Sequence, residues 1–210
     1  MEYQLTKTKV PVRGQYDVIV AGGGPAGCAA AASAAREGAK TLLIESSGML
    51  GGMATKGLVE AWTPYTDGEK IIYGGISKRV FLENKNGMPH IAKDHYDWVP
   101  IDFETLKTQY DNLMKEYGVE ILFQTMVCAV EMKDDRNVDA LIVANKAGLS
   151  AYQAKVYIDC TGDADIAAWA GNPFAYGSDD KHDVQPCSHC FVIANVNEEE
   201  YNKYPSLYGG

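Results

Sequence analysis

The spacing of apolar residues predicts a strand-helix-strand unit over residues 16–45. A short, β-branched apolar run at 18–21 is typical of a buried strand, and 40–45 has the same character. Between them, residues 28–37 are strong helix formers, and Gly38 stands where a helix C-cap belongs. This order is that of a βαβ unit, from which parallel sheets are built.

Helical spacing recurs in two further segments. Residues 76–85 carry apolar side chains on one face and are followed by Gly87 as a helix end. In 103–117 the apolar residues recur every three or four positions, Asp102 is a suitable N-cap, and Gly118 stands at the C′ position. We therefore predict two amphipathic helices.

In the second half of the chain, the apolar pattern predicts a group of strands. It begins with a buried strand at 119–123 and continues as an antiparallel meander. The candidate strands of the meander are 125–132, 138–145 and 149–157. The last strand continues to Cys160, and a short helix is expected at 164–170. The predicted fold class is α/β, a Rossmann-like parallel sheet with an antiparallel three-stranded β-meander.

The turn after the first strand carries a glycine pattern suited to phosphate binding. The spacing G-x-G-x-x-G falls at Gly22, Gly24 and Gly27. The first glycine allows a tight turn, the second lets a pyrophosphate approach the backbone, and the third lets the helix pack on the strand. Glu45 ends the second strand, where a carboxylate can accept hydrogen bonds from the ribose hydroxyls of an adenosine. The apolar residues within the Gly-rich loop 46–57 argue against a solvated surface loop.

Composition excludes several kinds of partner. The net charge is −9 and no basic stripe is present, so we expect neither nucleic acid nor an anionic membrane as a partner. The apolar fraction of 46% is ordinary for a globular chain. The first 15 residues lack the apolar core of a signal peptide and no run is long enough to span a bilayer, so we expect a cytoplasmic protein.

The cysteines offer little chemistry. They are Cys28, Cys128, Cys160, Cys187 and Cys190. Their odd number and mostly apolar surroundings are typical of buried free thiols in a reducing cytoplasm. Cys187, His189 and Cys190, with His182 nearby, are ligand types that zinc takes. We expect no metal, because a single C-x-x-C is weak evidence and a strand would turn Cys190 away from the other two.

Three blocks of the sequence resemble FAD-dependent oxidoreductases of the glutathione-reductase-like fold. They are 16–27 together with Glu45, the loop 50–55, and the segment 158–165. The resemblance implies FAD as the cofactor and roles for particular residues. It places the pyrophosphate on Gly22, Gly24, Pro25, Ala26 and Gly27, the adenosine ribose on Glu45 beside Ser46, and adenine at the backbone of Val127. The ribityl chain and the flavin would follow Gly51, Gly52, Met53, Ala54 and Thr55. Thr161, Gly162 and Asp163 would lie over the pyrophosphate or the ribityl chain. Asp163 is also a candidate N-cap for the helix at 164–170.

The sequence departs from this family in two ways. The region after Glu45 lacks the C-x-x-x-x-C of the dithiol flavoenzymes, so disulfide-reductase chemistry of that type is not supported. The family's chains are also usually much longer. We expect an N-terminal extension at 1–14, an FAD-binding domain at 15–171 with an inserted segment at 58–100, and the incomplete start of a second, substrate domain at 172–210.

Three functions follow, in decreasing order of support. The first is an FAD-dependent oxidoreductase that transfers a hydride between a small organic substrate and the flavin, with an unknown second electron acceptor. The second is a fragment or subunit that binds FAD or another dinucleotide without turnover. The third is an NAD-dependent dehydrogenase. A flavin carries the hydride chemistry itself, so the sequence points to no particular catalytic side chain. The sequence is compatible with a homo-oligomer.

Overall fold

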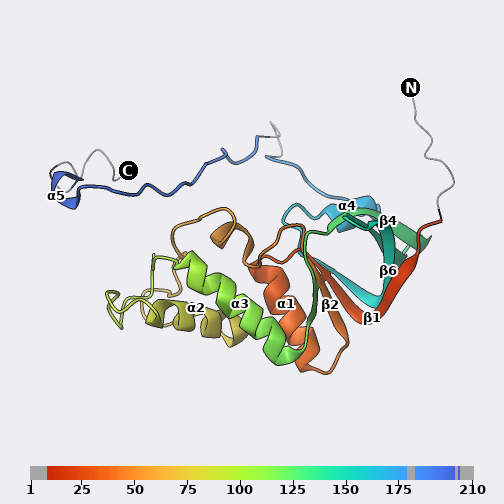
Figure 1. The fold of residues 1–210 in the computed structure, drawn as a ribbon, viewed down its shortest axis with the longest axis horizontal. Helices are drawn as coiled ribbons and strands as arrows, with labels where there is room; N and C mark the ends of the chain where they lie inside the picture. The colour runs from red at the N-terminus through yellow and green to blue at the C-terminus, as the bar shows by residue number, and fades with distance from the viewer. Residues whose placement is uncertain (1–8, 179–182, 202, 204–210) are drawn as a thin grey trace.

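A mixed sheet is the framework on which the helices pack (Figure 1). The computed structural model describes residues 9–178, 183–201 and 203. In this part of the chain the sheet has six strands in the order β3-β2-β1-β6-β5-β4. They are β1 (Val12–Ala21), β2 (Thr41–Ile44), β3 (Glu120–Leu122), β4 (Met126–Asp134), β5 (Asn137–Asn145) and β6 (Gly148–Asp159). The predicted α/β fold class is confirmed.

The sheet has a parallel and an antiparallel half, and β6 belongs to both. Strands β3, β2, β1 and β6 are parallel neighbours, whereas β6, β5 and β4 form the antiparallel meander. The first residues of β6 pair with β5, and from Ala151 onward β6 pairs with β1 as far as Asp159. Strand β1 is longer than the predicted run at 18–21, because its first half also pairs with β6 through the backbone. This half has a polar sequence, so no apolar pattern marks it as a strand.

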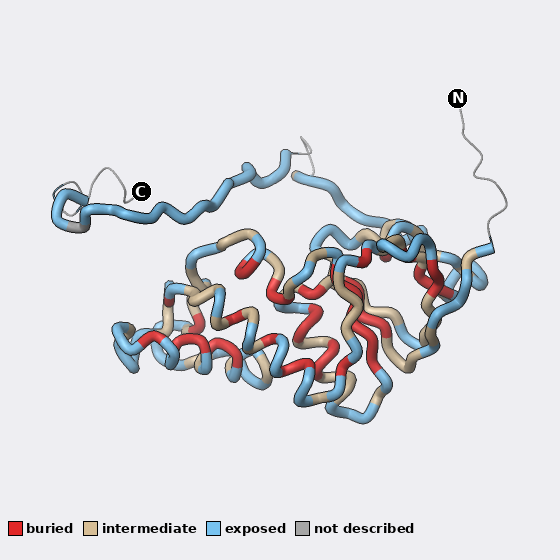
Figure 2. Tube along the Cα trace, in the orientation of Figure 1, coloured by how far each residue is buried: buried red, intermediate tan, exposed pale blue. Residues whose placement is uncertain are grey.

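Two apolar clusters cover the two faces of the sheet, since successive side chains of β1 point to opposite faces. Val20 faces helix α1 (Pro25–Arg36) and helix α3 (Phe103–Tyr117), which supply much of the first cluster. Ile19 and Ala21 face the second cluster, to which β5 and helix α4 (Asp165–Trp169) contribute. Figure 2 shows that buried residues concentrate in the sheet and in the helices beside it.

The helix boundaries follow their capping residues. The Asp102 carboxylate accepts the backbone N–H of Thr105 at 3.0 Å, so α3 begins as predicted, and Gly118 ends it with φ of 71°. Helix α1 occupies 25–36, starting earlier than the predicted 28–37 because Pro25 is suited to the first helical turn. Helix α2 (Gly75–Asn86) matches the predicted 76–85 within one residue at each end.

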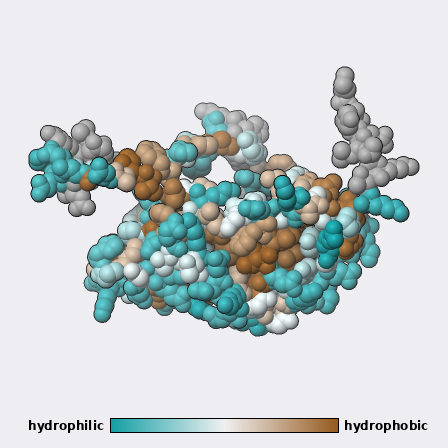
Figure 3. All heavy atoms as spheres, in the orientation of Figure 1, coloured by the Kyte–Doolittle hydropathy of each residue, from teal (hydrophilic) through white to brown (hydrophobic). Residues whose placement is uncertain are grey.

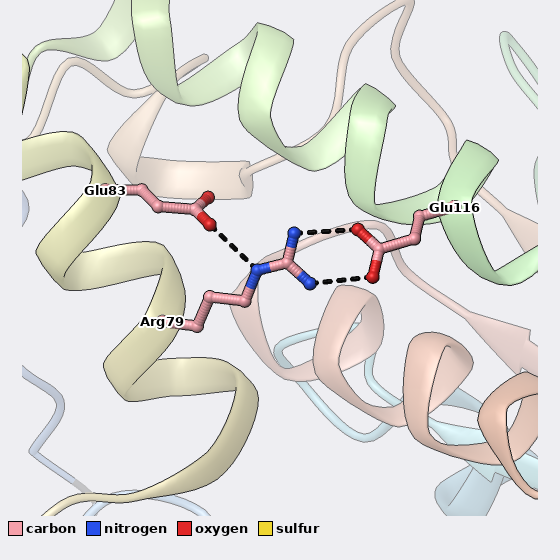
Figure 4. A network of polar contacts seen from close by, with 3 residues as sticks. All are labelled: Arg79, Glu83 and Glu116. Carbon is pink, nitrogen blue, oxygen red and sulfur yellow. Dashed lines mark hydrogen bonds and ion pairs between the residues drawn. The ribbon is translucent and has the colours of Figure 1, made fainter.

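The segment 58–100 is tied to α3 by polar contacts from α2. The guanidinium of Arg79 donates to both carboxylate oxygens of Glu116, at 2.9 and 2.7 Å, and its Nε donates to Glu83 at 2.8 Å (Figure 4). The buried Asn84 amide donates to the carbonyl of Asp102 at 2.9 Å and accepts its N–H at 3.1 Å. This second contact holds α2 at the point where α3 begins.

The described residues after α4, 172–178 and 183–197, run in extended form away from the sheet, and a short helix α5 (Glu198–Tyr201) follows them (Figure 1). Its apolar residues are largely exposed: the exposed fractions are 69% for Phe191 and 67% for both Val192 and Ile193. Hydrophobic residues gather along this segment in Figure 3. Within the described ranges, no helix is long and apolar enough to cross a membrane.

Candidate functional site

The glycine-rich turn lies where the carboxyl ends of β1, β2 and β6 meet. Gly22 donates its N–H to Ile44 at 2.8 Å, and its φ is +95°. A Cβ at Gly22 would lie 2.2 Å from the carbonyl oxygen of Cys160, and one at Gly27 would lie 1.7 Å from the oxygen of Gly22. These two positions exclude any side chain, as the sequence motif requires for the tight turn and the close packing of helix on strand.

The space beside Gly24 is open. No atom of a non-neighbouring described residue lies within 4 Å of where its Cβ would be. Gly24 is the N-cap of α1, and no side chain in the described part of the molecule caps this end of the helix. Pro25 and Ala26 are exposed. The first turn of a twelve-residue helix therefore presents backbone N–H groups and the positive end of its dipole to this space, which fits a phosphate group.

Glu45 is a buried carboxylate next to this turn, with 8% of its surface exposed. One oxygen accepts the N–H of Gly23 at 2.7 Å, and the other accepts the N–H of Ser47 at 2.7 Å and the hydroxyl of Ser46 at 3.3 Å. Burial alone raises the pKa of this carboxyl, but the hydrogen bonds outweigh it and hold the pKa below its usual value. The group is therefore ionised at neutral pH and suited to accept hydrogen bonds from ribose hydroxyls.

The Gly-rich loop packs directly on the glycine turn. Gly51 donates its N–H to the carbonyl of Gly23 at 2.8 Å, and a Cβ at Gly52 would lie 3.0 Å from the Cα of Gly24. The loop continues as the short 3₁₀ helix η1 (Gly52–Ala54), in which Met53 is 67% exposed. The side chain of Thr55 is buried and donates to the carbonyl of Leu50 at 2.6 Å, so it stabilises the loop.

The start of β4 is attached to Glu45 through the backbone. Thr125 donates its N–H to the carbonyl of Glu45 at 3.1 Å, and Gln124 donates to the carbonyl of Ser47 at 2.9 Å. Val127 follows two residues after this link, on a strand that forms one edge of the sheet. The fold therefore brings Val127 to the same side of the site as Glu45.

The turn after β6 is organised by Asp159, a residue for which no separate role is predicted from the sequence. Its carboxylate accepts the N–H and the hydroxyl of Thr161, at 3.0 and 2.8 Å, and the N–H of Ala167 at 2.9 Å. The spacing Asp-x-Thr at a strand end is a signal for such a turn. The N-cap of α4 is Ala164, so the prediction that Asp163 caps this helix is wrong; Asp163 is exposed instead.

The cysteines lie in different environments. Cys28 is fully buried in the core, and burial raises the pKa of its thiol to about 12, so it is a packing residue. The prediction of buried thiols is wrong for Cys128, Cys187 and Cys190, which are exposed. His182 falls outside the described residues, and within them no three His, Cys, Asp or Glu side chains gather as a metal-binding group.

The chain belongs to the FAD-dependent oxidoreductase family, because the family's sequence model, "FAD dependent oxidoreductase", matches residues 17–207. FAD is the cofactor of this family, and the open space at Gly24 together with the ionised Glu45 fits a dinucleotide. The match favours FAD over the NAD considered as an alternative.

Two curated relatives show similarity. Digeranylgeranylglycerophospholipid reductase of Picrophilus torridus is 25% identical over 205 residues, which cover 90% of this chain and 49% of that protein. Glutathione reductase of Schizosaccharomyces pombe is 34% identical over 91 residues, which cover 42% of this chain and 18% of that protein. The chain thus spans about half the length of the first relative and less of the second.

Solved structures share the fold. A geranylgeranyl bacteriochlorophyll reductase-like protein from Thermoplasma acidophilum aligns with a TM-score of 0.54 and 24% identity, over 75% of this chain and 42% of that one. The p-nitrophenol 4-monooxygenase of Pseudomonas putida aligns with a TM-score of 0.55 and 16% identity, over 76% and 44%. At these identities the likeness concerns the fold.

Proposed function

We propose that the chain binds FAD and contributes this site to an oxidoreductase that transfers a hydride between FAD and a small organic substrate. The observation that carries the proposal is the coincidence of three features at one sheet edge. They are an uncapped helix N-terminus with open space at Gly24, the ionised carboxylate of Glu45, and the loop at Gly51 and Gly52, which packs against the glycine turn.

Each part of the site would hold a different part of the cofactor. Glu45 and Ser46 would bind the adenosine ribose, and the backbone of Val127 would meet adenine. The pyrophosphate would lie on the first turn of α1, at Gly24 and Ala26. Backbone hydrogen bonds between the glycine turn, the end of β2 and the start of β4 support this arrangement of the cofactor. The net charge of −9 also supports it, because backbone N–H groups are then the natural partners of the anionic pyrophosphate.

The flavin end would follow the loop from Gly51 to Thr55, with Thr161, Gly162 and Asp163 on the other side of the turn. FAD supplies the two-electron chemistry when bound, and the residues of the chain orient it and shield it from water. The buried hydroxyl of Thr55 would act on the loop's shape, since it already bonds to Leu50.

We also propose a domain layout for the chain. The unit at 15–171 would be the FAD-binding domain, with 58–100 as an insertion packed on α3. The extended, exposed segment after residue 171 would begin a second domain, because its apolar residues lack a core of their own. Free cysteines support a reducing, cytoplasmic location.

The alternative is a dinucleotide-binding fragment or subunit that does not turn over alone, which the partial coverage of relatives favours. The test is a visible absorption spectrum of the purified chain after incubation with FAD and desalting, with any bound ligand released and identified by mass. Retained flavin bands would support the proposal. A folded chain that retains no flavin, or that retains NAD instead, would contradict it. Reduction of retained flavin by organic substrates would separate the enzyme from the binding fragment.

A further inference from the structure

A hollow with a volume of about 390 Å³ lies beyond the Gly-rich loop, between the body of the fold and the extended residues 189–192. Leu58, Glu60, Ile101 and Phe103 form its inner side. Residues 189–192 form its outer side. No part of the site described above, from the glycine turn to the turn after β6, lines this hollow.

Backbone contacts attach the inner side to the proposed flavin-binding loop. Val59 donates its N–H to the carbonyl of Met53 at 3.0 Å, and Leu58 is held in the left-handed region with φ of 55°. Ile101 donates to the carbonyl of Glu60 at 2.9 Å. The path from Glu45 through Gly24 and the loop therefore leads to this hollow, at the end where the flavin would lie.

The lining combines apolar surface with one negative charge. Among the described residues that line the hollow, Glu60 is the one acidic side chain, and none is a lysine or an arginine. Phe191 and Val192 remain 69% and 67% exposed, so an apolar molecule placed between them and Phe103 would be covered on two sides.

From this combination we propose that the hollow is the substrate subsite and takes a small amine with an apolar body. The ammonium group would lie by Glu60, and the apolar body would lie between Phe103 and Phe191. This inference rests on the proposed function for its link to the flavin, but amine binding is measurable without turnover. An anionic substrate would be repelled by Glu60 and by the chain's net charge of −9.

Two cysteines make the test possible, because Cys190 lines the hollow and Cys187 does not, while both are exposed. The chain is treated with iodoacetamide, with and without benzylamine, and alkylation at each cysteine is followed by peptide mass spectrometry. We expect benzylamine to slow alkylation of Cys190 in a saturable manner and to leave Cys187 unchanged. Equal protection by benzoate, or no protection of Cys190, would overturn the proposal.

A charge variant sharpens the result. Glu60→Gln should weaken the apparent affinity for benzylamine by about 2- to 5-fold, the range of a partly exposed ion pair, while Glu69→Gln, an exposed glutamate outside the hollow, should leave it unchanged. Equal affinities in Glu60→Gln and the parent would also overturn the proposal. Retained flavin absorbance is recorded on the same samples, so failure of FAD binding with intact protection of Cys190 would reject the proposed function and not the amine subsite.

Discussion

At the scale of single residues, Gly24 and Gly27 meet opposite constraints although they belong to one motif. A methyl group at Gly24 would enter open space, and the backbone there has an ordinary φ of −70°. A methyl group at Gly27 would overlap the carbonyl oxygen of Gly22, which is part of the backbone and has no flexible end to move. The fold thus requires a glycine at position 27, whereas the requirement for Gly24 would come from the proposed pyrophosphate.

The pair Gly24→Ala and Gly27→Ala separates these two requirements. Gly24→Ala should leave the free energy of unfolding within about 0.5 kcal/mol of the parent while abolishing retention of FAD, because the methyl group takes the space of the phosphate. Gly27→Ala should destabilise the fold by about 1–3 kcal/mol or more. Urea unfolding and desalting with FAD measure the two effects. Full FAD retention by Gly24→Ala would contradict this account of the site.

Glu45→Gln tests the buried carboxylate. The amide has one acceptor where the carboxylate has two, so either the N–H of Gly23 or that of Ser47 would face a donor. We expect a loss of about 1–3 kcal/mol in unfolding free energy, and roughly tenfold weaker FAD binding for one lost ribose contact. Exposed Glu37→Gln is the matched control and should change neither quantity.

The stability difference between the parent and Glu45→Gln should depend on pH in one direction. Because the folded-state pKa of Glu45 is lowered, its contribution is fully present above the unfolded pKa of about 4.3 and is lost as the pH falls through the folded pKa. The two proteins should therefore converge in acid. Urea titrations between neutral pH and pH 3 check this, and a gap that widens in acid would contradict the assignment.

Some site residues could be predicted from the sequence and others could not. Gly22 and Gly27 are fixed by local backbone geometry, so the spacing of the motif is sufficient. The buried direction of Thr55 and the capping contacts of Asp159 depend on how irregular loops fold against distant strands. The N-cap role predicted for Asp163 failed for the same reason, because Asp159 reaches the helix from the strand end.

At the scale of elements, α2 is attached to α3 by one exposed and one buried polar contact. Arg79 and Glu116 remain about 40–45% exposed, so solvent screens their attraction even with bidentate geometry. Asn84 is fully buried and pairs with both backbone groups of Asp102. The buried contact should therefore contribute more to stability than the ion pair shown in Figure 4.

Two substitutions test this ranking. Asn84→Leu should cost about 1–3 kcal/mol in unfolding free energy, since it leaves the N–H of Asp102 unpaired, while the Asp102 carbonyl keeps the N–H of Leu106 as a partner. Arg79→Met should cost about 1 kcal/mol or less. Chemical denaturation of both variants measures the difference, and a larger loss in Arg79→Met than in Asn84→Leu would reverse the ranking.

Helices with strong apolar periodicity, such as α2 and α3, were predicted within one residue. The length of β1 was not, because the half of this strand that contains Arg13 and Gln15 pairs through its backbone and has no apolar pattern to mark it. The pairing of β6 with both β1 and β5 is likewise a property of the assembled sheet. Sequence periodicity shows that a strand is buried and does not identify its neighbours.

At the scale of the whole molecule, a ligand that binds only the folded state raises its stability by mass action. FAD at about 100 times its dissociation constant should add about 2.7 kcal/mol, or roughly 5–10 °C in melting temperature for a chain of this size. Thermal denaturation with FAD, NAD and no ligand measures this. An equal or larger shift with NAD would contradict FAD as the preferred dinucleotide.

The position of β1 between β2 and β6 has a consequence for the nascent chain during synthesis. Its partner β6 lies more than a hundred residues later, with Ala21 opposite Asp159. At a synthesis rate of about 5–20 residues per second, β1 would wait roughly 7–28 seconds for this partner to be made. Until then one edge of an apolar strand is unpaired, so the nascent chain should depend on chaperones during this interval more than a protein whose neighbouring strands are consecutive.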